Sequence, residues 1–417
     1  MTEHPWWRIG RRSLGRNRRR TVITALGLAF GYFAVVVLIG MMLGIVSEMV
    51  ESGTGIVSGQ IQVHAADYLP DHSVYATIGG DAGTPVGPLL DSIAADPAVL
   101  AAAPRVYGGG LVSTGSATAA ASLMGVDPAR EVRVAQLATA IVAGRLPRPG
   151  ERAIALGAEL ARRIHARPGD TVVVVAPAAD GSLGNDLYVV AGVFKSGVQP
   201  LDAGTALLPI GVLQNLMALG PDRIHEVAVK LADPYAAPGV AARLARRLKV
   251  AGALVQPWTV TSPELVEYAG MMRASNWIVL VVVFGMAIFG VANTLLMATY
   301  ERRREFALLL ALGAAPRHIV RTVVYEALAI GVVSLLAGAA VTVPVLVWWH
   351  RAPLDLGRLF SDFTLAGALV RPVLKTDDPG AWSYIAAAAL LVTALAAAVV
   401  PAFRAARVPP ADTLAGR

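Results

Sequence analysis

The sequence predicts a membrane protein with four transmembrane α-helices and a large α+β extracytoplasmic domain between the first and second spans. Three observations support this prediction: the composition, four long apolar runs and the placement of arginine. Hydrophobic residues make up 55% of the 417 residues and charged residues only 16%, whereas ordinary globular chains carry about 25% charged residues. A chain so poor in charge needs a solvent other than water for part of its surface.

Four apolar runs predict the membrane spans. Each run lacks ionisable side chains and exceeds the ~20 residues that a helix needs to cross ~30 Å of hydrocarbon. The predicted spans are 21–46, 277–299, 327–349 and 381–403. The first is too long for the apolar part of a secretory signal, so we expect it to be retained. Ionisable groups inside spans usually mark proton or ion pathways, so their absence argues against a proton-coupled transporter and a channel.

Arginine placement predicts the orientation of the spans. Residues 1–20 carry seven arginines and one acid, and arginines also crowd the loop 300–321 and the tail 404–417. These three segments are expected in the cytoplasm because positive residues accumulate on that side. The domain 47–276 and the loop 350–380 then lie on the opposite side. The net charge of +7 is therefore a signal of topology and does not indicate a nucleic-acid partner.

The domain 47–276 is predicted to contain two β-α-β-like halves with a β-rich lobe, at about 125–215, inserted between them. A β-branched run at 171–175 and the segment 186–194 should form a hairpin inside this lobe. The first half is expected as a strand near Ile61, a helix at 89–100 and a strand at 106–112, and the second half as a strand at 224–231, a helix at 239–249 and a strand at 254–260.

The sequence lacks the motifs of the common catalytic sites. A phosphate-binding loop needs Gly-Lys, yet the four lysines follow Phe, Val or Leu. The serine-hydrolase elbow and the His-Glu-x-x-His zinc motif are also missing. There is no cysteine, and the seven histidines are scattered without metal-ligand spacing. We therefore predict no catalytic residue, no metal site and no cofactor bound by this chain, which is not expected to be an enzyme.

The loop 300–321 is the most informative segment. Residues 300–319 read YERRREFALLLALGAAPRHI, which predicts a short amphipathic helix from Glu301 to Leu312 at the membrane face. Glu301 and Glu305, four residues apart, are expected on one side of this helix, and its apolar side is expected to consist of Phe306, Leu309, Leu310 and Leu312. Gly313 stands where a helix-ending glycine belongs, and Pro316 is suited to open the next helix. The alternative is a basic loop that merely satisfies the positive-inside rule.

This loop resembles the cytoplasmic segment of the MacB, FtsX and Lol group of ABC permeases, whose pattern runs approximately E-R-x-R-E-I-x-x-L-R-A-L-G-A-S. The chain departs from the pattern at Leu310 and at Ala315-Pro316. The basic start at 16–21, the ending at 401–414 and the order of one span, a large domain and three spans are similar to the same group. The matching positions in the loop are Glu301, Arg302, Arg304, Glu305, Leu309, Ala311, Leu312, Gly313 and Ala314.

The resemblance implies a function and partners. The loop would be a coupling helix that docks into an ABC ATPase subunit, and ATP-Mg would be bound by that subunit. A second permease chain, identical or related, would complete the assembly in the bacterial inner membrane, with the large domain on the periplasmic side. The residues expected to contact the ATPase are Glu301, Arg302, Arg304, Glu305, Leu309, Leu312, Gly313 and Ala314.

Within this group the sequence is most similar to Lol-type lipoprotein-releasing permeases. The segment 58–64 resembles the start of their outer domain, and the hairpin 173–190 resembles the region that binds a periplasmic lipoprotein carrier. Its tip would then be a carrier-binding loop, although an ordinary hairpin turn fits the same residues. These residues are Ala179, Asp180, Gly181, Ser182 and Leu183.

Two other functions are compatible with the resemblance. One is MacB-like efflux of peptides or hydrophobic compounds. The other is FtsX-like transmembrane signalling to a cell-wall hydrolase. Four methionines near the outer ends of the first two spans, Met41, Met42, Met271 and Met272, are candidates to face lipid or substrate, because methionine is a pliable lining for apolar ligands. Ordinary helix packing explains them equally well.

Overall fold

The chain divides into two compact units. The computed structural model describes residues 18–69, 73–80, 85–248, 252–355, 363–365, 368–370 and 373–414. The membrane unit contains Met1–Val46, Gly270–Leu356 and Val373–Arg417, and the outer domain contains Ser47–Ala269 and Gly357–Pro372. Each unit is described by itself.

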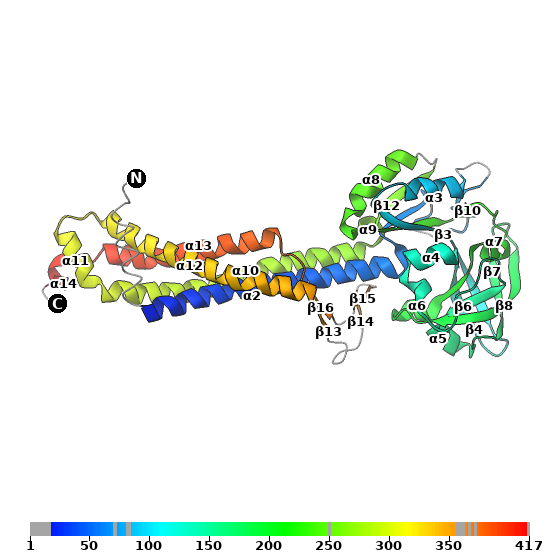
Figure 1. The fold of residues 1–417 in the computed structure, drawn as a ribbon, viewed down its shortest axis with the longest axis horizontal. Helices are drawn as coiled ribbons and strands as arrows, with labels where there is room; N and C mark the ends of the chain where they lie inside the picture. Colours follow the sequence, from blue (N-terminus) through cyan, green and yellow to red (C-terminus); the bar gives the residue numbers. More distant parts are fainter. Residues whose placement is uncertain are drawn as a thin grey trace. The chain divides into compact units, whose positions relative to one another are not determined.

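Four helices in the described part of the chain are long and apolar enough to cross a membrane, which confirms the predicted four-span fold class. They are longer than the apolar runs, because the helical backbone continues beyond the stretch that needs lipid. A helix of 39 residues such as α10 is ~58 Å long, about twice the hydrocarbon thickness. The four helices are α2 (Arg18–Gly53), α10 (Pro263–Glu301), α12 (Pro316–Arg351) and α13 (Ala381–Ala406). Figure 1 shows them side by side.

The four helices share one apolar core. Val35 and Ile39 of α2, Phe284 of α10, Ile330 of α12 and Leu390 of α13 are among its buried members. Small residues let α12 approach α13 closely, and a Cβ on Gly331 would lie 3.1 Å from the Cβ of Ala394. Large apolar residues such as Phe289 remain exposed. Lipid is the solvent that such an apolar outer surface requires.

The segment after the third span folds back onto the first. The backbone N–H of Asp377 donates to the carbonyl of Gly40 (3.0 Å), and Trp349 Nε1 donates to the carbonyl of Leu374 (2.8 Å). A Cβ on Gly44 would lie 2.2 Å from the carbonyl oxygen of Lys375, so glycine is required there. In the membrane unit β13 (Leu354–Asp355) pairs with β16 (Val373–Leu374), and in the outer-domain unit β14 (Phe363–Leu365) pairs with β15 (Ala368–Val370).

The outer domain begins with an open antiparallel sheet in the order β12-β1-β11-β3. Two β-α-β units interleave in it, β1-α3-β3 and β11-α8-β12, because β11 pairs between β1 and β3. Helices α3 and α8 pack against each other beside this sheet (Figure 1). The elements are β1 (Ile61–Ala65), α3 (Val86–Ala94), β3 (Val99–Ser113), β11 (Glu226–Leu231), α8 (Ala237–Leu248) and β12 (Ala253–Pro257).

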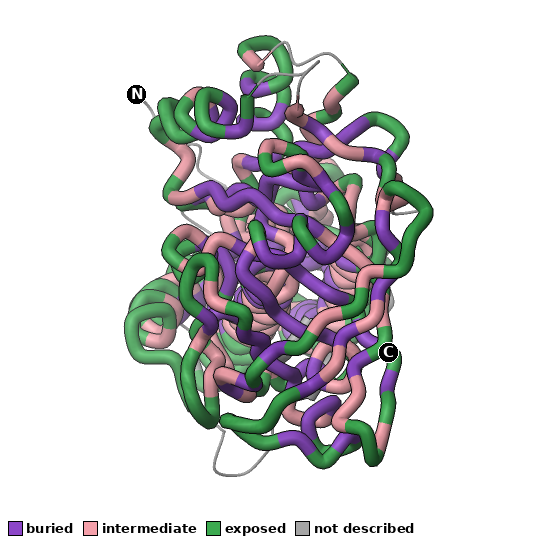
Figure 2. Tube along the Cα trace, turned by 90° about the vertical axis from the view of Figure 1, so that its right-hand side faces the viewer, coloured by how far each residue is buried: buried purple, intermediate pink, exposed green. Residues whose placement is uncertain are grey.

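Strand β3 continues from the open sheet into a closed ring of six strands. The pairings run β3-β4-β9-β6-β8-β7 and return to β3. Strand β5 pairs with β8 outside this ring. Buried residues gather on the strands and exposed residues on the loops around them (Figure 2). The added strands are β4 (Thr118–Val126), β5 (Ile141–Gly144), β6 (Ala153–Gly157), β7 (Thr171–Pro177), β8 (Leu183–Phe194) and β9 (Thr205–Pro209).

Short elements complete the two units. In the outer domain they are η1 (Thr54–Ser58), β2 (Ile78–Gly79), α4 (Pro128–Val134), η2 (Gln136–Thr139), α5 (Ala158–Arg163), α6 (Gln199–Gly204), α7 (Ile210–Leu216), β10 (Arg223–Ile224), η3 (Pro234–Ala236) and α9 (Trp258–Thr261). In the membrane unit they are α11 (Arg303–Ala311) and α14 (Pro410–Leu414).

The predicted helix 89–100 was wrong at its C-terminal end. Helix α3 stops at Ala94 and β3 starts at Val99. Pro97 disfavours helical backbone at the residue before it and cannot donate a hydrogen bond. The Asp96 side chain accepts from the N–H of Ala98 (3.1 Å), and the carbonyl of Asp96 accepts from Val99 (3.0 Å). This turn converts the helix into the strand.

Candidate functional site

A short helix joins the second and third spans. Helix α10 ends at Glu301, Arg302 leaves the helical region with φ −100° and ψ 13°, and α11 runs from Arg303 to Ala311. The predicted helix from Glu301 to Leu312 is therefore corrected at its start. The break at Arg302 places Glu301 and Glu305 in different helices, so they do not share one helical face.

Gly313 ends α11 in the way the sequence predicts. Its φ is +90°, a left-handed conformation that glycine adopts without a Cβ penalty. The N–H of Ala314 donates to the carbonyl of Leu309 and the N–H of Gly313 to that of Leu310, both at 3.0 Å. This is the Schellman pattern, which satisfies the last helical carbonyls. Pro316 then stands in the first turn of α12.

The buried face of α11 holds the helix against α12 and α13 at one end of the membrane unit. Phe306 is 2% exposed and Ala307 is fully buried. Phe306 packs in a cluster with Ile319 and Val323 of α12 and with Ala402 and Ala405 of α13. Leu309 and Leu310 border this cluster. The helix is thus fixed by apolar contacts to α12 and α13 and is not a free loop.

Arg302 fastens the start of α11 to the third span. Its Nη1 lies 3.1 Å from Oε2 of Glu326 in α12, and its Nε lies 3.1 Å from Oε2 of Glu305 in α11. The guanidinium also stands 5.0 Å from the centre of the Phe306 ring, within range of a cation–π contact. Sequence analysis did not single out Glu326. The only feature of the sequence that could have indicated its role is its position, a carboxylate directly before the uncharged span 327–349.

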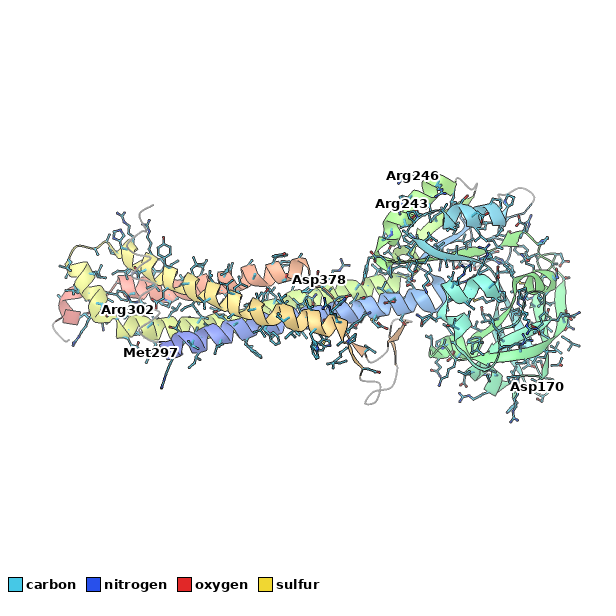
Figure 3. All side chains as sticks on the ribbon, in the orientation of Figure 1. Asp170, Arg243, Arg246, Met297, Arg302 and Asp378 are labelled. Carbon is cyan, nitrogen blue, oxygen red and sulfur yellow. The ribbon has the colours of Figure 1, made fainter. Side chains whose placement is uncertain are left out.

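The opposite face of α11 is open. Arg304, Leu308 and Leu312 are exposed, and Leu308 and Leu312 reach 52% and 75% exposure. Arginine is enriched at protein contact surfaces, and the exposed leucines beside it add apolar area that a contact there would bury. Of the predicted docking residues, Arg302 and Leu309 face the protein. Figure 3 labels Arg302 and Asp378 toward opposite ends of the membrane unit, so this surface lies at the arginine-rich end.

Two family descriptions together match most of the chain. The MacB-like periplasmic core domain matches residues 21–247, and the FtsX-like permease C-terminal domain matches residues 277–410. The chain belongs to the MacB/FtsX family of ABC transporter permeases. The outer domain of this permease is accordingly of the MacB-like periplasmic type.

Several relatives of the permease are similar over most of its length. "Lipoprotein-releasing system transmembrane protein LolC" from Xylella fastidiosa is 28% identical, covering 97% of each chain. The protein of the same name from Neisseria meningitidis is 26% identical over 82% of this chain and 81% of its own. "Lipoprotein-releasing system transmembrane protein LolE" from Haemophilus influenzae is 24% identical over 58% of this chain and 59% of its own.

Solved structures of outer domains are also similar to the permease. The periplasmic region of MacB from Actinobacillus actinomycetemcomitans matches with a TM-score of 0.35 and 13% identity, covering 51% of this chain and 93% of that one. The extracellular domain of the ABC-type transporter YknZ from Gram-positive bacteria matches with a TM-score of 0.33 and 14% identity, covering 47% and 98%.

The predicted carrier-binding loop is the tight turn between β7 and β8 of the permease. Asp180 accepts from the N–H and the hydroxyl of Ser182 at 2.9 and 2.6 Å, and these bonds hold the pKa of its carboxyl below the usual range. The N–H of Ala179 donates to the carbonyl of Met217 (2.8 Å), which ties the turn to the end of α7. Leu183 is 73% exposed. Hydrogen bonds thus hold the turn, and the first residue of β8 presents an exposed apolar side chain beside it.

The four predicted methionines lie on two spans of the permease. Met41 and Met42 belong to α2 and are half-buried, as is Met272 of α10. Met271 is 56% exposed. Their role in facing lipid or substrate stays a prediction.

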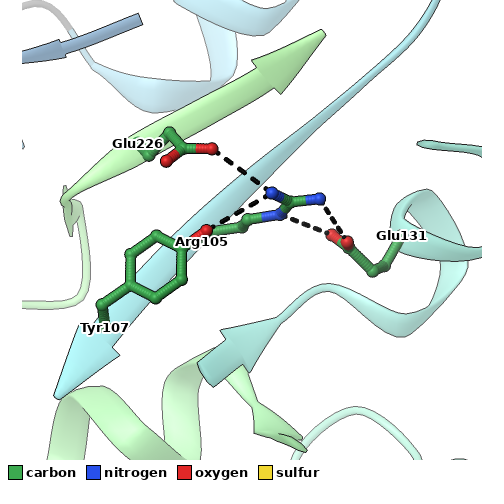
Figure 4. A network of polar contacts seen from close by, with 4 residues as sticks. All are labelled: Arg105, Tyr107, Glu131 and Glu226. Atoms are coloured by element: carbon green, nitrogen blue, oxygen red, sulfur yellow. Dashed lines mark hydrogen bonds and ion pairs between the residues drawn. The ribbon is translucent and has the colours of Figure 1, made fainter. Parts of the chain in front are cut away.

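A buried polar network in the outer domain was not predicted. Arg105 of β3 is fully buried and forms two hydrogen bonds to Glu131 of α4, at 2.6 and 3.2 Å (Figure 4). Its Nη1 lies 3.3 Å from both Oε1 of Glu226 in β11 and the hydroxyl of Tyr107 in β3. The network therefore joins α4, the open sheet and the strand that continues into the closed ring.

Burial decides the protonation of this network. It raises the pKa of Glu226 to about 7, because desolvation of the carboxylate outweighs the attraction of Arg105. Next to it, the N–H of Tyr107 donates to Nδ1 of His225 (3.0 Å), so the proton of that ring lies on Nε2, which donates to the carbonyl of Val74 (3.1 Å). Burial lowers the pKa of His225. The imidazole is therefore neutral at pH 7 and structural.

Proposed function

We propose that this permease releases lipoproteins from the inner membrane of a bacterium, using ATP hydrolysed by a separate ABC ATPase subunit. The observation that carries the proposal is how α11 packs against the spans. One face is fixed to α12 and α13 by Phe306 and Arg302, and the other exposes Leu308 and Leu312 at the arginine-rich end. The lipoprotein-releasing relatives, similar over up to 97% of the chain, support the choice of cargo.

The partners follow from this arrangement. The exposed face of α11 docks on the ATPase, which binds ATP-Mg, since the sequence has no Gly-Lys phosphate loop of its own. A second permease chain, identical or related, pairs with a second ATPase. The hairpin turn Ala179–Leu183 of the outer domain binds the periplasmic lipoprotein carrier.

Helix α11 transmits movement of the ATPase to the spans as a rigid body. Closure of the ATPase pair pushes on the exposed face of α11. The buried face transmits this movement to α12 and α13, because close-packed apolar contacts do not let the helices slide past one another. Helices α2 and α10 continue without interruption from the membrane unit into the residues of the outer domain. A switch between two packed arrangements can therefore reach the outer domain without a solute pore.

The docking surface is tested by reversing its character. We expect Leu308→Glu with Leu312→Glu to abolish co-purification of the permease with its ATPase, because two carboxylates replace apolar contacts that would be buried. Arg321→Glu on α12 is the matched control, since it makes the same charge change at an exposed cytoplasmic position. Docking at α11 would be refuted if the control variant lost co-purification with the ATPase, or if the double variant retained it.

The cargo is tested in cells depleted of the permease. We expect outer-membrane lipoproteins to accumulate in the inner membrane, and the wild-type gene, but not the Leu308/Leu312 variant, to restore their sorting. Fractionation and immunoblotting of a reporter lipoprotein measure the result. Correct sorting without the permease would reject lipoprotein release and direct attention to efflux or to cell-wall signalling.

A further inference from the structure

A cavity of about 470 Å³ opens at the cytoplasmic end of the membrane unit. It lies between the end of α10, the start of α11 and the end of α13 with the residues that follow. Three arginines line it: Arg303 of α11, Arg404 of α13 and Arg407 just after α13. The volume is within the range of small-molecule sites, roughly 300–1,000 Å³.

The three arginines of this cavity form no ion pair within the described part of the chain. None of the ion pairs found among those residues includes Arg303, Arg404 or Arg407. Arg302, their neighbour, is in contrast held by two carboxylates. Three cations around one cavity repel each other, and an anion placed between them relieves that repulsion.

The walls of the cavity are apolar and face outward. Val399, Val400 and Phe403 of α13 line it and are 49%, 52% and 55% exposed. Tyr300, at the end of α10, also lines it and is 60% exposed. Tyrosine is enriched near the ends of membrane spans, where the membrane meets water. A ligand that fits both features is anionic at one end and carries a hydrocarbon chain at the other.

We propose that this cavity binds the headgroup of an anionic phospholipid from the cytoplasmic leaflet, with the phosphate between the three arginines and an acyl chain along Val399, Val400 and Phe403. Basic cavities between spans on the cytoplasmic side suit such headgroups. The positive-inside rule and the dipole of a helix C-terminus account for Arg404 and Arg407. The positive-inside rule also places Arg303 on this side of the membrane, but it does not specify that Arg303, at the start of another helix, lines the same cavity.

The proposed lipid site includes part of α11, the helix that would transmit movement from the ATPase. Arg303 starts α11, whereas Arg404 and the apolar wall belong to α13. A bound headgroup therefore bridges the two elements and holds the start of α11 against the fourth span. The proposal does not depend on the cargo or on the ATPase contact of Leu308 and Leu312.

Lipid retention by the full-length permease tests the site. The protein in dodecyl maltoside micelles is titrated with phosphatidylglycerol, with phosphatidylethanolamine or with inorganic phosphate, and bound species are counted by native mass spectrometry. We expect phosphatidylglycerol to be retained over the other two. Replacing Arg303, Arg404 and Arg407 by glutamine should weaken its binding roughly fivefold for each arginine removed. Lysine at all three positions should keep most of the binding, which also shows that the fold tolerates substitution there.

The matched control removes three arginines elsewhere at the same end. Arg19, Arg317 and Arg321 are exposed and do not line the cavity, so glutamine at these positions should leave retention unchanged. Equal loss in the control, equal retention of phosphatidylethanolamine, or equal binding of inorganic phosphate would overturn the proposal. A cavity variant that retains phosphatidylglycerol but loses the ATPase would overturn it as well, by assigning the arginines to a protein contact.

Discussion

Arg302 shows how a single side chain can fix the position of a helix. It reaches Glu305 in α11, Glu326 in the third span and the face of Phe306. Its side chain is 14% exposed and that of Glu326 is 11% exposed. An ion pair so shielded from water depends on both partners, because removing one leaves a charge without compensation.

We expect Arg302→Ala to lower the free energy of unfolding by about 2 kcal/mol, since the Glu326 carboxylate loses its charged hydrogen-bond donor. Unfolding of the purified chain by dodecyl sulfate in mixed micelles measures the change. Arg304→Ala, an exposed neighbour, should change it by about 0.5 kcal/mol or less. A double-mutant cycle with Glu326→Gln should show coupling. Additive effects of the two substitutions would mean that the pair contributes nothing.

Glu226 predicts a pH dependence of the outer domain. Its pKa is raised from 4.5 to about 7, so between these values the folded state binds more protons than the unfolded state. The stability of β3 and β11 should therefore fall as the pH rises from 5 to 8. Hydrogen exchange of these strands in the intact chain, corrected for the intrinsic exchange rate, measures it. Glu226→Gln should remove the dependence, and a slope that persists in this variant would assign it to another group.

At the scale of the element, α11 shows which of its features follow from sequence periodicity and which depend on packing against other helices. The pattern predicted a helix here and its end at Gly313. It did not predict the break at Arg302, since arginine favours helix, and the break accompanies the ion pair to Glu326 in another helix. The pattern also placed Leu312 with Phe306 on one apolar face, whereas Leu312 is 75% exposed and Phe306 is buried.

Gly313→Ala tests the end of this element. We expect a cost of about 1–2 kcal/mol, because alanine is strained at a φ of +90° although no atom lies within 4 Å of the added Cβ. Gly285→Ala in α10 is the control, since its Cβ also meets open space but its backbone is helical; it should be neutral or slightly stabilising. Mixed-micelle unfolding measures both. Equal effects of the two substitutions would show that the left-handed cap carries no stability.

At the scale of the whole molecule, orientation is the property that all else depends on. The chain has no cysteine, so a single introduced thiol is a clean probe. We expect Ser116→Cys in the outer domain to react with an impermeant maleimide in intact spheroplasts, and Ala311→Cys in α11 to react only after lysis. Both positions are exposed, so access alone decides the result. The reverse pattern would invert the topology and exclude docking of a cytoplasmic ATPase at α11.

The sequence by itself determined the four spans and the α+β character of the domain between them. Lipid requires about 20 consecutive apolar residues and strands require alternation, and both are local properties of the chain. Only the tertiary structure decided that β3 belongs to both the open sheet and the closed ring, and that Arg105 meets Glu131 and Glu226. These partners lie 26 and 121 residues from Arg105. No local pattern encodes such a meeting, because it exists only once distant strands have paired and excluded water.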